Sequence, residues 1–190
     1  MKKLLVASTL ALAALGAAQA ADGIKPLIGF GITFGGETIA TVPFSDGSTE
    51  RISSGGLIAL YGGVEFKVAP QVALQATVGY HVDDTQAASN GSLRFSRYPV
   101  DLLALYSVND RVRLGVGVQH VSSAKLAGSG VAKNINVSFE GSTGVILEAE
   151  YLLMPQIGLK ARGVSHKYKV KGGSGEIDGD HFGLMLNYYF

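Results

Sequence analysis

The sequence has no cysteine, no tryptophan and little charge. Only 16% of its 190 residues are charged, against roughly 25% in an average soluble domain, whereas 47% are hydrophobic. Without cysteine the protein can form neither a disulfide nor a thiolate-based metal or redox site. The net charge is only +1 and the chain has no basic run, so it lacks the electrostatic pattern of a nucleic-acid-binding protein.

Residues 1–20 have the composition of a secretory signal peptide. Residues 1–3 provide a basic start, residues 4–18 are apolar, and residues 18–20 (Ala-Gln-Ala) match the small-x-small cleavage pattern. We therefore expect a cleavable signal peptide followed by one domain over residues 21–190. Removing the two lysines of the signal leaves 14 basic and 15 acidic residues in that domain.

After residue 20, apolar residues recur at every second position, which is the period of a β-strand. The longest apolar run, 55–64, is well short of the ~20 residues that a transmembrane helix needs. No segment keeps a helical period. The strand period appears in eight segments, at about 26–37, 56–68, 72–82, 93–108, 112–122, 138–153, 157–169 and 179–190.

The connections between these segments alternate in length. Three are short turns at 69–71, 109–111 and 154–156, and the other four are long and rich in Gly, Ser, Asp and Asn. Short turns at one rim and long loops at the other are typical of an outer-membrane barrel. The sequence therefore predicts an all-β fold, an eight-stranded antiparallel up-and-down transmembrane β-barrel. A secreted lipocalin-like barrel or sandwich is the alternative, because alternation alone does not show which face points inward. The long connections are expected at 38–55, 83–92, 123–137 and 167–178.

In a transmembrane barrel the apolar parity faces lipid, and it carries most of the aromatic residues. Aromatic girdles at both membrane interfaces are a feature of outer-membrane barrels. We expect one girdle near the short turns, formed by Phe66, Tyr106, Tyr151, Tyr188 and Phe190. We expect the other near the long loops, formed by Phe34, Tyr80, Tyr98, Phe139 and Phe182.

The opposite parity carries charged residues, which predicts an ionic network inside the barrel. A basic residue on the lipid face at mid-membrane costs about 2–4 kcal/mol, and the lumen of an eight-stranded barrel is just wide enough for side chains to fill. The third short turn sets a register that pairs Glu150 with Lys160 and Glu148 with Arg162. We interpret the set as a plug; a gated or proton-conducting path is the alternative. The predicted network comprises Glu65, Lys67, Asp101, Arg113, Glu148, Glu150, Lys160 and Arg162.

The signal peptide, the eight segments and the final residues 183–190 (GLMLNYYF) together resemble the small OmpA/OmpX-like outer-membrane barrels of Gram-negative bacteria. The resemblance implies a monomer in the outer membrane, surrounded by its lipids and lipopolysaccharide. It also implies recognition by periplasmic chaperones and the barrel-assembly machinery through the closing strand. Because the sequence stops at Phe190, we expect no peptidoglycan-binding domain of the kind full OmpA proteins carry. The assembly signal comprises Phe182, Leu184, Leu186, Tyr188 and Phe190.

Some eight-stranded barrels are enzymes that act on lipid A, including a deacylase with a lipid-facing His-x-Ser pair. His120 and Ser122 form such a pair in the fifth segment, and Glu140 is the candidate acid. So short a motif arises easily by chance. In the deacylase the pair belongs to the seventh strand, where this sequence has Gly163 in place of histidine. We therefore expect no enzyme.

We expect no metal or cofactor either. His81 and His181 share one end of the predicted lumen, but a metal site needs more ligands than the sequence supplies around them. Lys167, Lys169 and Lys171 make the last long connection basic and are candidates for contact with lipopolysaccharide phosphates.

The sequence thus predicts an outer-membrane barrel with a structural or surface-interaction role and a charge-plugged lumen. A narrow passive channel for small solutes is the first alternative. A lipid A-modifying, deacylase-like enzyme is the second.

Overall fold

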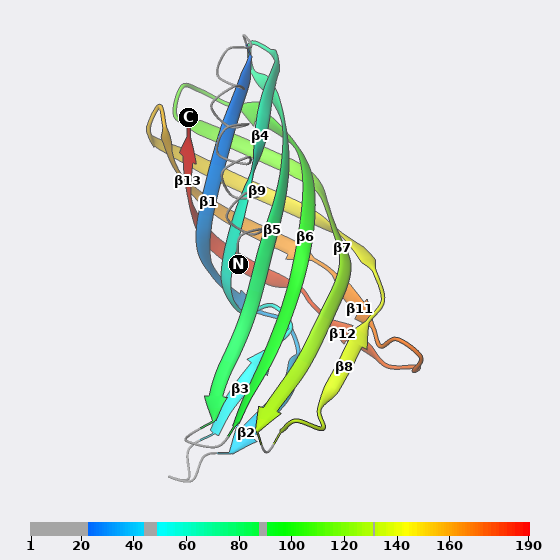
Figure 1. The fold of residues 1–190 in the computed structure, drawn as a ribbon. Coiled ribbons are helices and arrows are strands. Elements are labelled where there is room, and N and C mark those ends of the chain that lie inside the picture. The colour runs from blue at the N-terminus through cyan, green and yellow to red at the C-terminus, as the bar shows by residue number, and fades with distance from the viewer. Residues whose placement is uncertain (1–22, 44–48, 88–90, 131) are drawn as a thin grey trace, which may run out of the picture.

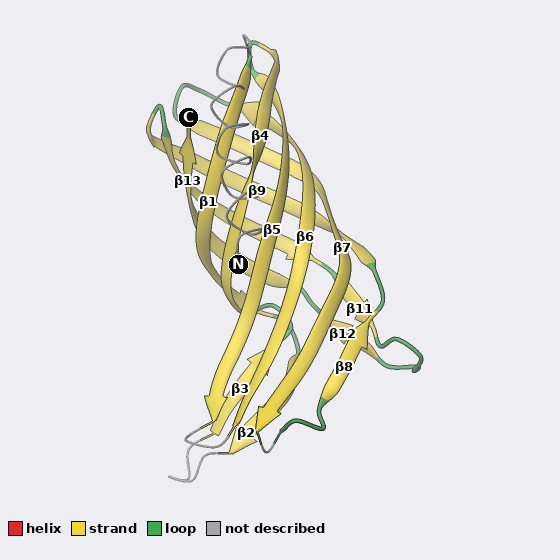
Figure 2. Ribbon diagram, in the orientation of Figure 1, coloured by secondary structure: helices red, strands yellow, loops and turns green. Residues whose placement is uncertain are grey.

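The computed structural model describes residues 23–43, 49–87, 91–130 and 132–190. The regular secondary structure of these residues consists of β-strands (Figure 2). Among these residues no helix is long and apolar enough to cross a membrane. The strands are β1 (Ile24–Gly35), β2 (Thr38–Pro43), β3 (Thr49–Ser53), β4 (Leu57–Ala69), β5 (Val72–Ala87), β6 (Gly91–Ser107), β7 (Val112–Gly130), β8 (Asn136–Phe139), β9 (Ser142–Met154), β10 (Ile157–Ser165), β11 (Lys167–Lys169), β12 (Glu176–Asp178) and β13 (His181–Tyr189).

Eight of these strands close into an antiparallel barrel (Figure 1). The order around the barrel is β1, β4, β5, β6, β7, β9, β10 and β13, and β13 pairs with β1 to complete the ring. Closure leaves no free strand edge within the membrane, where an unpaired backbone group would have no partner. The predicted fold class, an eight-stranded transmembrane barrel, is confirmed.

The alternation of side chains gives the barrel an apolar outside and a polar inside. Outward residues such as Phe30, Leu102 and Leu147 keep 56–62% of their surface exposed. Inward residues at the neighbouring positions are buried even where they are charged, as at Asp101 and Glu148. This arrangement is inverted relative to a water-soluble barrel and matches a surface surrounded by lipid.

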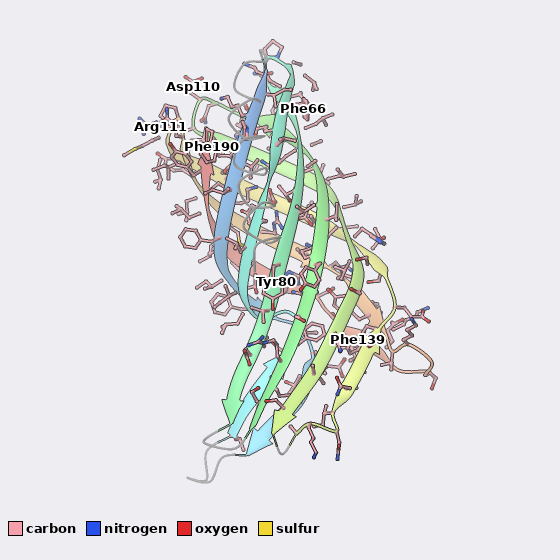
Figure 3. All side chains as sticks on the ribbon, in the orientation of Figure 1. Phe66, Tyr80, Asp110, Arg111, Phe139 and Phe190 are labelled. Atoms are coloured by element: carbon pink, nitrogen blue, oxygen red, sulfur yellow. The ribbon has the colours of Figure 1, made fainter. Side chains whose placement is uncertain are left out.

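Figure 3 shows how the aromatic residues mark the two ends of the barrel. Phe66 and Phe190 lie at the same end as the short turn that contains Asp110 and Arg111, whereas Tyr80 lies towards the opposite end. At that opposite end Tyr80 packs against Tyr98, with ring centroids 5.2 Å apart. The two girdles therefore lie where the sequence places them, with one exception described below.

Three barrel strands run well past the girdle and build a second region, here called the outer extension (Figure 1). It consists of the ends of β5, β6 and β7 (residues 83–87, 91–97 and 124–130), β8, and the hairpins β2–β3 and β11–β12. The connections expected to be loops therefore contain much of their own strand structure. The strands continue into these connections because apolar residues recur there on the inward face. Leu93 and Phe95 on β6 and Leu126 on β7 are buried and pack against one another.

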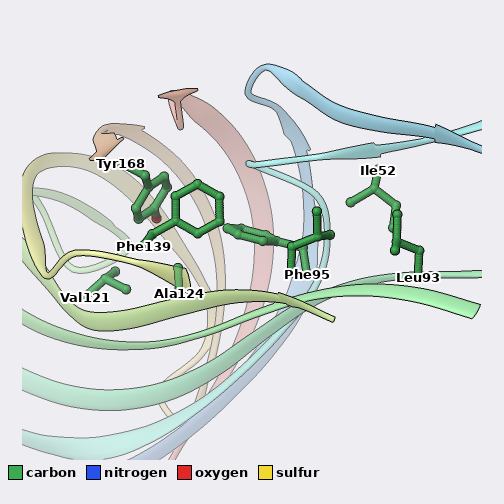
Figure 4. Close-up of a cluster of buried hydrophobic side chains, with 8 residues drawn as sticks. Ile52, Leu93, Phe95, Val121, Ala124, Phe139 and Tyr168 are labelled. Carbon is green, nitrogen blue, oxygen red and sulfur yellow. The ribbon is translucent and has the colours of Figure 1, made fainter. Parts of the chain in front are cut away.

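The outer extension has an apolar core (Figure 4). Phe95, Phe139 and Tyr168 pack edge to face, with ring centroids 5.7–6.2 Å apart. Such aromatic packing is worth about 0.5–1.5 kcal/mol per pair beyond the buried area. The core cluster comprises Ile52, Leu93, Phe95, Val121, Ala124, Leu126, Phe139 and Tyr168.

The position of Phe139 corrects the prediction for the upper girdle. We expected one strand over 138–153, which would turn Phe139 outward; it is in fact 3% exposed, inside the extension. Strand structure is interrupted at residues 140–141, between β8 and β9. Inward side chains are at odd positions before this interruption, as at Phe139, and at even positions after it. A bulge in β7 has a similar effect: Pro99 pairs with Val121 but Arg97 pairs with Ala124, so one extra residue lies between them.

Candidate functional site: the lumen

The lumen contains two connected groups of ion pairs, and the first surrounds Arg113. Its guanidinium donates from Nη1 to Glu65 Oε1 at 2.9 Å and from Nη2 to Glu150 Oε2 at 2.5 Å. Tyr189 Oη receives a hydrogen bond from Arg113 at 2.6 Å and donates to Glu150 Oε1 at 2.6 Å. The guanidinium also lies 4.9 Å above the Tyr189 ring. Arginine suits this place because its planar fork can engage two carboxylates at once.

The second group surrounds Glu148. Lys160 Nζ lies 2.7 Å from Glu148 Oε2, and Arg162 Nε lies 2.5 Å from Glu148 Oε1. Arg162 also reaches Asp101 Oδ2 at 2.6 Å, and Gln119 donates to the other oxygen of Asp101 at 3.0 Å. All five side chains are buried.

Gln75 connects the two groups. Its Oε1 accepts from Lys160 Nζ at 3.2 Å, and its Nε2 donates to Glu65 Oε2 at 3.3 Å. The network is therefore continuous from Glu65 near the short-turn end to Asp101 near the outer extension.

The predicted register is present, but one of its two pairs makes a different contact. Glu150 lies opposite Lys160 and Glu148 lies opposite Arg162, as expected. Arg162 does pair with Glu148, whereas Lys160 reaches diagonally to Glu148 and Glu150 binds Arg113. Glu150 also lies opposite Arg113 across the other neighbouring strand, and it pairs with Arg113, whose Nε and Nη2 both donate to Glu150 Oε2.

Lys67 is misplaced in the prediction. It is exposed, and among the described residues it forms no ion pair. It lines a cavity of about 480 Å³ that opens at the short-turn end together with Lys25, Glu65 and Arg113. The ion pair between Glu65 and Arg113 borders this cavity.

Arg97 forms a separate layer, between the network and the core of the outer extension. Its side chain has no exposed surface and lies near the rings of Phe95 and Tyr168, 5.8 and 5.7 Å from their centroids. It donates to His81 Nδ1 at 3.0 Å, to Tyr168 Oη at 3.0 Å and to the Ser54 carbonyl oxygen.

His81 is held on both sides as a neutral ring. Because arginine can only donate, Nδ1 of His81 accepts, which leaves Nε2 to donate to Thr33 Oγ1 at 2.6 Å. Sequence reasoning missed Arg97, although its spacing of four residues from Asp101 gives it the inward parity. Between this layer and the network lies a cavity of only about 20 Å³, roughly the space of one water molecule.

The residues proposed for catalysis are not brought together. His120 Nδ1 lies 3.0 Å from Thr143 Oγ1 on the exposed outer face, Ser122 lies in the bulge of β7, and Glu140 is exposed beyond β8. Among the described residues no hydrogen bond or ion pair joins any two of the three. The geometry therefore gives no Ser-His-acid arrangement at this site.

A different serine and histidine do meet above the girdle. Ser142 Oγ contacts His166 Nε2, and the His166 ring stacks on Tyr168 at 4.6 Å. Burial, and then the positive charge of Arg97, lower the pKa of His166 to about 4, so its ring is neutral at neutral pH. Asp180 accepts from the backbone N–H of His166 at 2.7 Å and so does not orient the ring. Within the described part of the chain, no group of three or more His, Cys, Asp or Glu residues could hold a metal ion.

The closing strand β13 pairs with β1 and β10 and faces lipid with one side. Phe182, Leu184 and Tyr188 are 43–50% exposed, as is the terminal Phe190, and Leu186 is half-buried. These residues have the outward parity that the predicted assembly signal requires. Their recognition during assembly stays a prediction.

The chain was compared with protein families, curated proteins and solved structures. A family model described as outer membrane protein beta-barrel domain matches residues 7–190. No curated protein matches the chain. Among solved structures, the attachment invasion locus protein Ail of Yersinia pestis, crystallised with the heparin analogue sucrose octasulfate, is 12% identical over 90% of this chain and 100% of that chain, with a TM-score of 0.54.

Neisserial surface protein A is also similar. It is 11% identical over 89% of this chain and 98% of that chain, with a TM-score of 0.54. At these identities the likeness shows the fold alone. The family model, by contrast, covers nearly the whole sequence, and the closed barrel carries its apolar face outward. The chain belongs to the outer membrane protein beta-barrel domain family.

Proposed function

We propose that this protein is a sealed, non-conducting outer-membrane barrel that acts through its outer surface. The observation that supports the seal is that three successive layers of side chains fill the lumen along its axis. The ion-pair network is followed by the Arg97 layer and then by the apolar core of the outer extension. A solute that enters from the short-turn end meets Arg113 and Glu65 first, and the cavity beside Arg162 and His81 further along the lumen measures only about 20 Å³.

Pairing of buried charges explains why such a seal resists opening. The three buried bases of the network, Arg113, Lys160 and Arg162, each form an ion pair with at least one of its four buried acids. Moving any one side chain aside leaves a buried partner without its counter-charge, which typically costs about 3–5 kcal/mol. A transient path through the lumen would have to break several of these pairs together.

Planar-bilayer recording tests the seal. The purified barrel is expected to give no sustained conductance, and Lys67→Gln is the matched control because Lys67 lies at the mouth outside the network. Arg113→Ala, which removes the ion pairs at the inner end of the mouth, is expected to raise the leak. Sustained conductance by the unchanged protein would overturn the seal and favour the passive channel.

The outer extension supports a role at the surface. Its apolar core joins β6, β7, β8 and the two hairpins, and its outer face carries polar residues such as Ser92, Arg94 and Lys125. In Ail, the crystallised complex holds a sulfated heparin analogue. For this chain we propose a surface-interaction role, but we do not assign it the heparin-like ligand of Ail. Whole-cell binding to host or abiotic surfaces, with and without residues 91–97 and 124–130 replaced by a short turn, tests it; unchanged binding would contradict it.

Export and assembly complete the proposal. We infer that residues 1–20 are removed, so amino-terminal sequencing of the membrane-bound protein is expected to begin at Ala21; a start at Met1 would contradict this. We also infer that β13 is read by the assembly machinery. Phe190→Ala is expected to lower the folded, heat-modifiable fraction in the outer membrane, and an unchanged fraction would refute the signal.

A further inference from the structure

The lipid-facing wall of the barrel has a notch at Gly163. In the same rung its neighbours are Leu147 on β9 and Phe182 on β13, which are 62% and 50% exposed. A Cβ atom at Gly163 would meet nothing within 4 Å. The notch is thus a low place between two large outward side chains.

Around the notch is an apolar groove of about 520 Å³, a size in the range of ligand-binding pockets. Aromatic residues border one side and aliphatic residues the other. Ser165 and Asp180 lie at its upper end, towards the outer extension. The lining includes Phe34, Val145, Leu147, Gly163 and Phe182.

A column of outward positions leads from this groove to the level of lipid headgroups. The alternation of buried and exposed residues continues from β10 into β11, so Gly163, Ser165 and Lys167 point the same way. At about 3.3 Å per residue, the hydroxyl lies about 7 Å and the lysine about 13 Å beyond the notch. The column thus passes from an apolar groove to a hydroxyl and then to a cation.

The cations at the top of the column are available to an anion. Lys167 pairs with Glu176 at 3.3 Å, but both side chains are well exposed, so the pair can exchange partners. Lys169 is exposed at the next outward position, and within the described residues it has no ion pair. The carboxylate of Asp180, in contrast, is engaged by the backbone N–H of His166.

We propose that this groove is a binding site for one acyl chain of lipopolysaccharide, whose phosphate contacts Lys167 and Lys169. The site lies at the rim that bears the outer extension, and its order of apolar groove, hydroxyl and cations matches a phosphorylated, acylated lipid. This inference does not depend on whether the lumen conducts.

A second lipid-facing glycine supplies the matched control. Gly62 on β4 lies opposite the outward Ile28. A Cβ there would make ordinary contacts, at 3.6 Å to the Leu27 carbonyl oxygen and 3.9 Å to Ile28 Cγ2. Gly62→Leu therefore adds the same lipid-facing side chain as Gly163→Leu but lies outside the groove.

Native mass spectrometry of the full-length mature protein in detergent, titrated with purified lipopolysaccharide, tests the site. The unchanged protein is expected to hold one lipopolysaccharide molecule, Gly163→Leu to bind at least tenfold more weakly, and Gly62→Leu to bind as the unchanged protein does. The Lys167→Gln, Lys169→Gln double variant is expected to bind several-fold more weakly and to lose salt dependence. Heat-modifiable gel mobility confirms that each variant is folded.

Three outcomes would overturn the proposal. Equal losses in Gly163→Leu and Gly62→Leu would show that the groove has no special role. Equal retention of phosphatidylethanolamine and lipopolysaccharide would show generic lipid contact. A dimer that disappears in Gly163→Leu while lipid binding persists would assign the groove to a second copy of the chain.

Discussion

The same strands have opposite chemistry in the barrel and in the outer extension. On β6, the outward Tyr98 and Leu102 are apolar and the inward Asp101 is charged, whereas beyond Tyr98 the outward Arg94 is charged and the inward Phe95 is apolar. Along β6 the backbone alternation is the same in both regions. What changes is the medium outside the wall, lipid below and water above, and each face takes the polarity that its medium favours.

Arg97 lies at the boundary between the polar interior of the barrel and the apolar core of the outer extension. It is inward, like the charges of the barrel, yet its guanidinium lies against two aromatic rings of the extension core. Its hydrogen bonds reach His81 on β5, Ser54 before β4 and Tyr168 on β11, and so link the barrel wall to the outer extension. The comparison therefore predicts that damage to the polar interior and damage to the apolar interior will have separate consequences.

The largest effect is expected inside the barrel. Arg162→Leu leaves Asp101 and one oxygen of Glu148 without their cation, and should lower the free energy of unfolding by about 3–5 kcal/mol. Urea titration in detergent, followed by gel mobility, measures it. Lys67→Gln, outside the network, should change stability by less than about 0.5 kcal/mol. Equal small effects for both would mean that the network does not hold the barrel.

The next effect is expected in the extension. Phe95→Ala removes a buried ring from its core and should cost about 3 kcal/mol, at the low end for such truncations. Hydrogen exchange should accelerate at residues 91–97 and 124–130 but not in β1 or β13. Loss of protection throughout the barrel would show that the two regions unfold as one.

Mirror substitutions on the outer face of β6 sharpen the comparison. Leu102→Lys places a charge among lipids and should cost about 2–4 kcal/mol. Arg94→Leu makes the reverse change in the extension and breaks only an exposed ion pair with Asp84, so its cost should stay below about 1 kcal/mol. Similar costs at both positions would contradict a change of medium between them.

The smallest effect is expected to be a pH dependence near His166, at the start of the β11–β12 hairpin. Burial lowers the pKa of His166 to about 4, below its ordinary value of 6.5, so the unfolded state binds more protons between these values. The contribution of the neutral ring is complete above pH 6.5 and is lost as the pH falls towards 4. The protection factors of amides 167–169, which compare the measured exchange rate with the intrinsic rate at each pH, should therefore fall between pH 7 and pH 5.

Two histidine variants separate this source from others. His166→Gln should remove the pH dependence, while His120→Gln, at an exposed outer position, should retain it. Retention in both would assign the effect to another group.

Much of the barrel could be predicted because membrane-spanning strands have a simple sequence pattern, in which apolar and polar or small residues alternate. Alternation and turn length fixed eight strands and the register that places Glu148 opposite Arg162, since each one-residue slip would turn every side chain to the wrong medium. Charge partners were less predictable. Lys160 has a long flexible stem and reaches past its opposite residue, which no spacing rule reveals.

The extension was harder to predict because its parity is interrupted. The break at residues 140–141 reverses the alternation, so extending the parity of β9 back to Phe139 places this residue on the outside, and the bulge after Val121 shifts the alternation within β7. Its strands also contain many Gly and Ser residues, which by composition indicate loops. Their order comes from a core assembled by distant segments, Ile52 and Tyr168 among them, and such contacts leave no local signal.

The inversion of chemistry along one strand can be measured directly, because the sequence has no cysteine and single cysteines can be placed at will. Spin labels at the even positions of β6 from 94 to 106 would report contact with lipid-soluble oxygen or with a water-soluble relaxation agent. We predict water contact at 94 and 96 and lipid contact at 100, 102 and 104. Water contact at 100 and 102 would contradict the account.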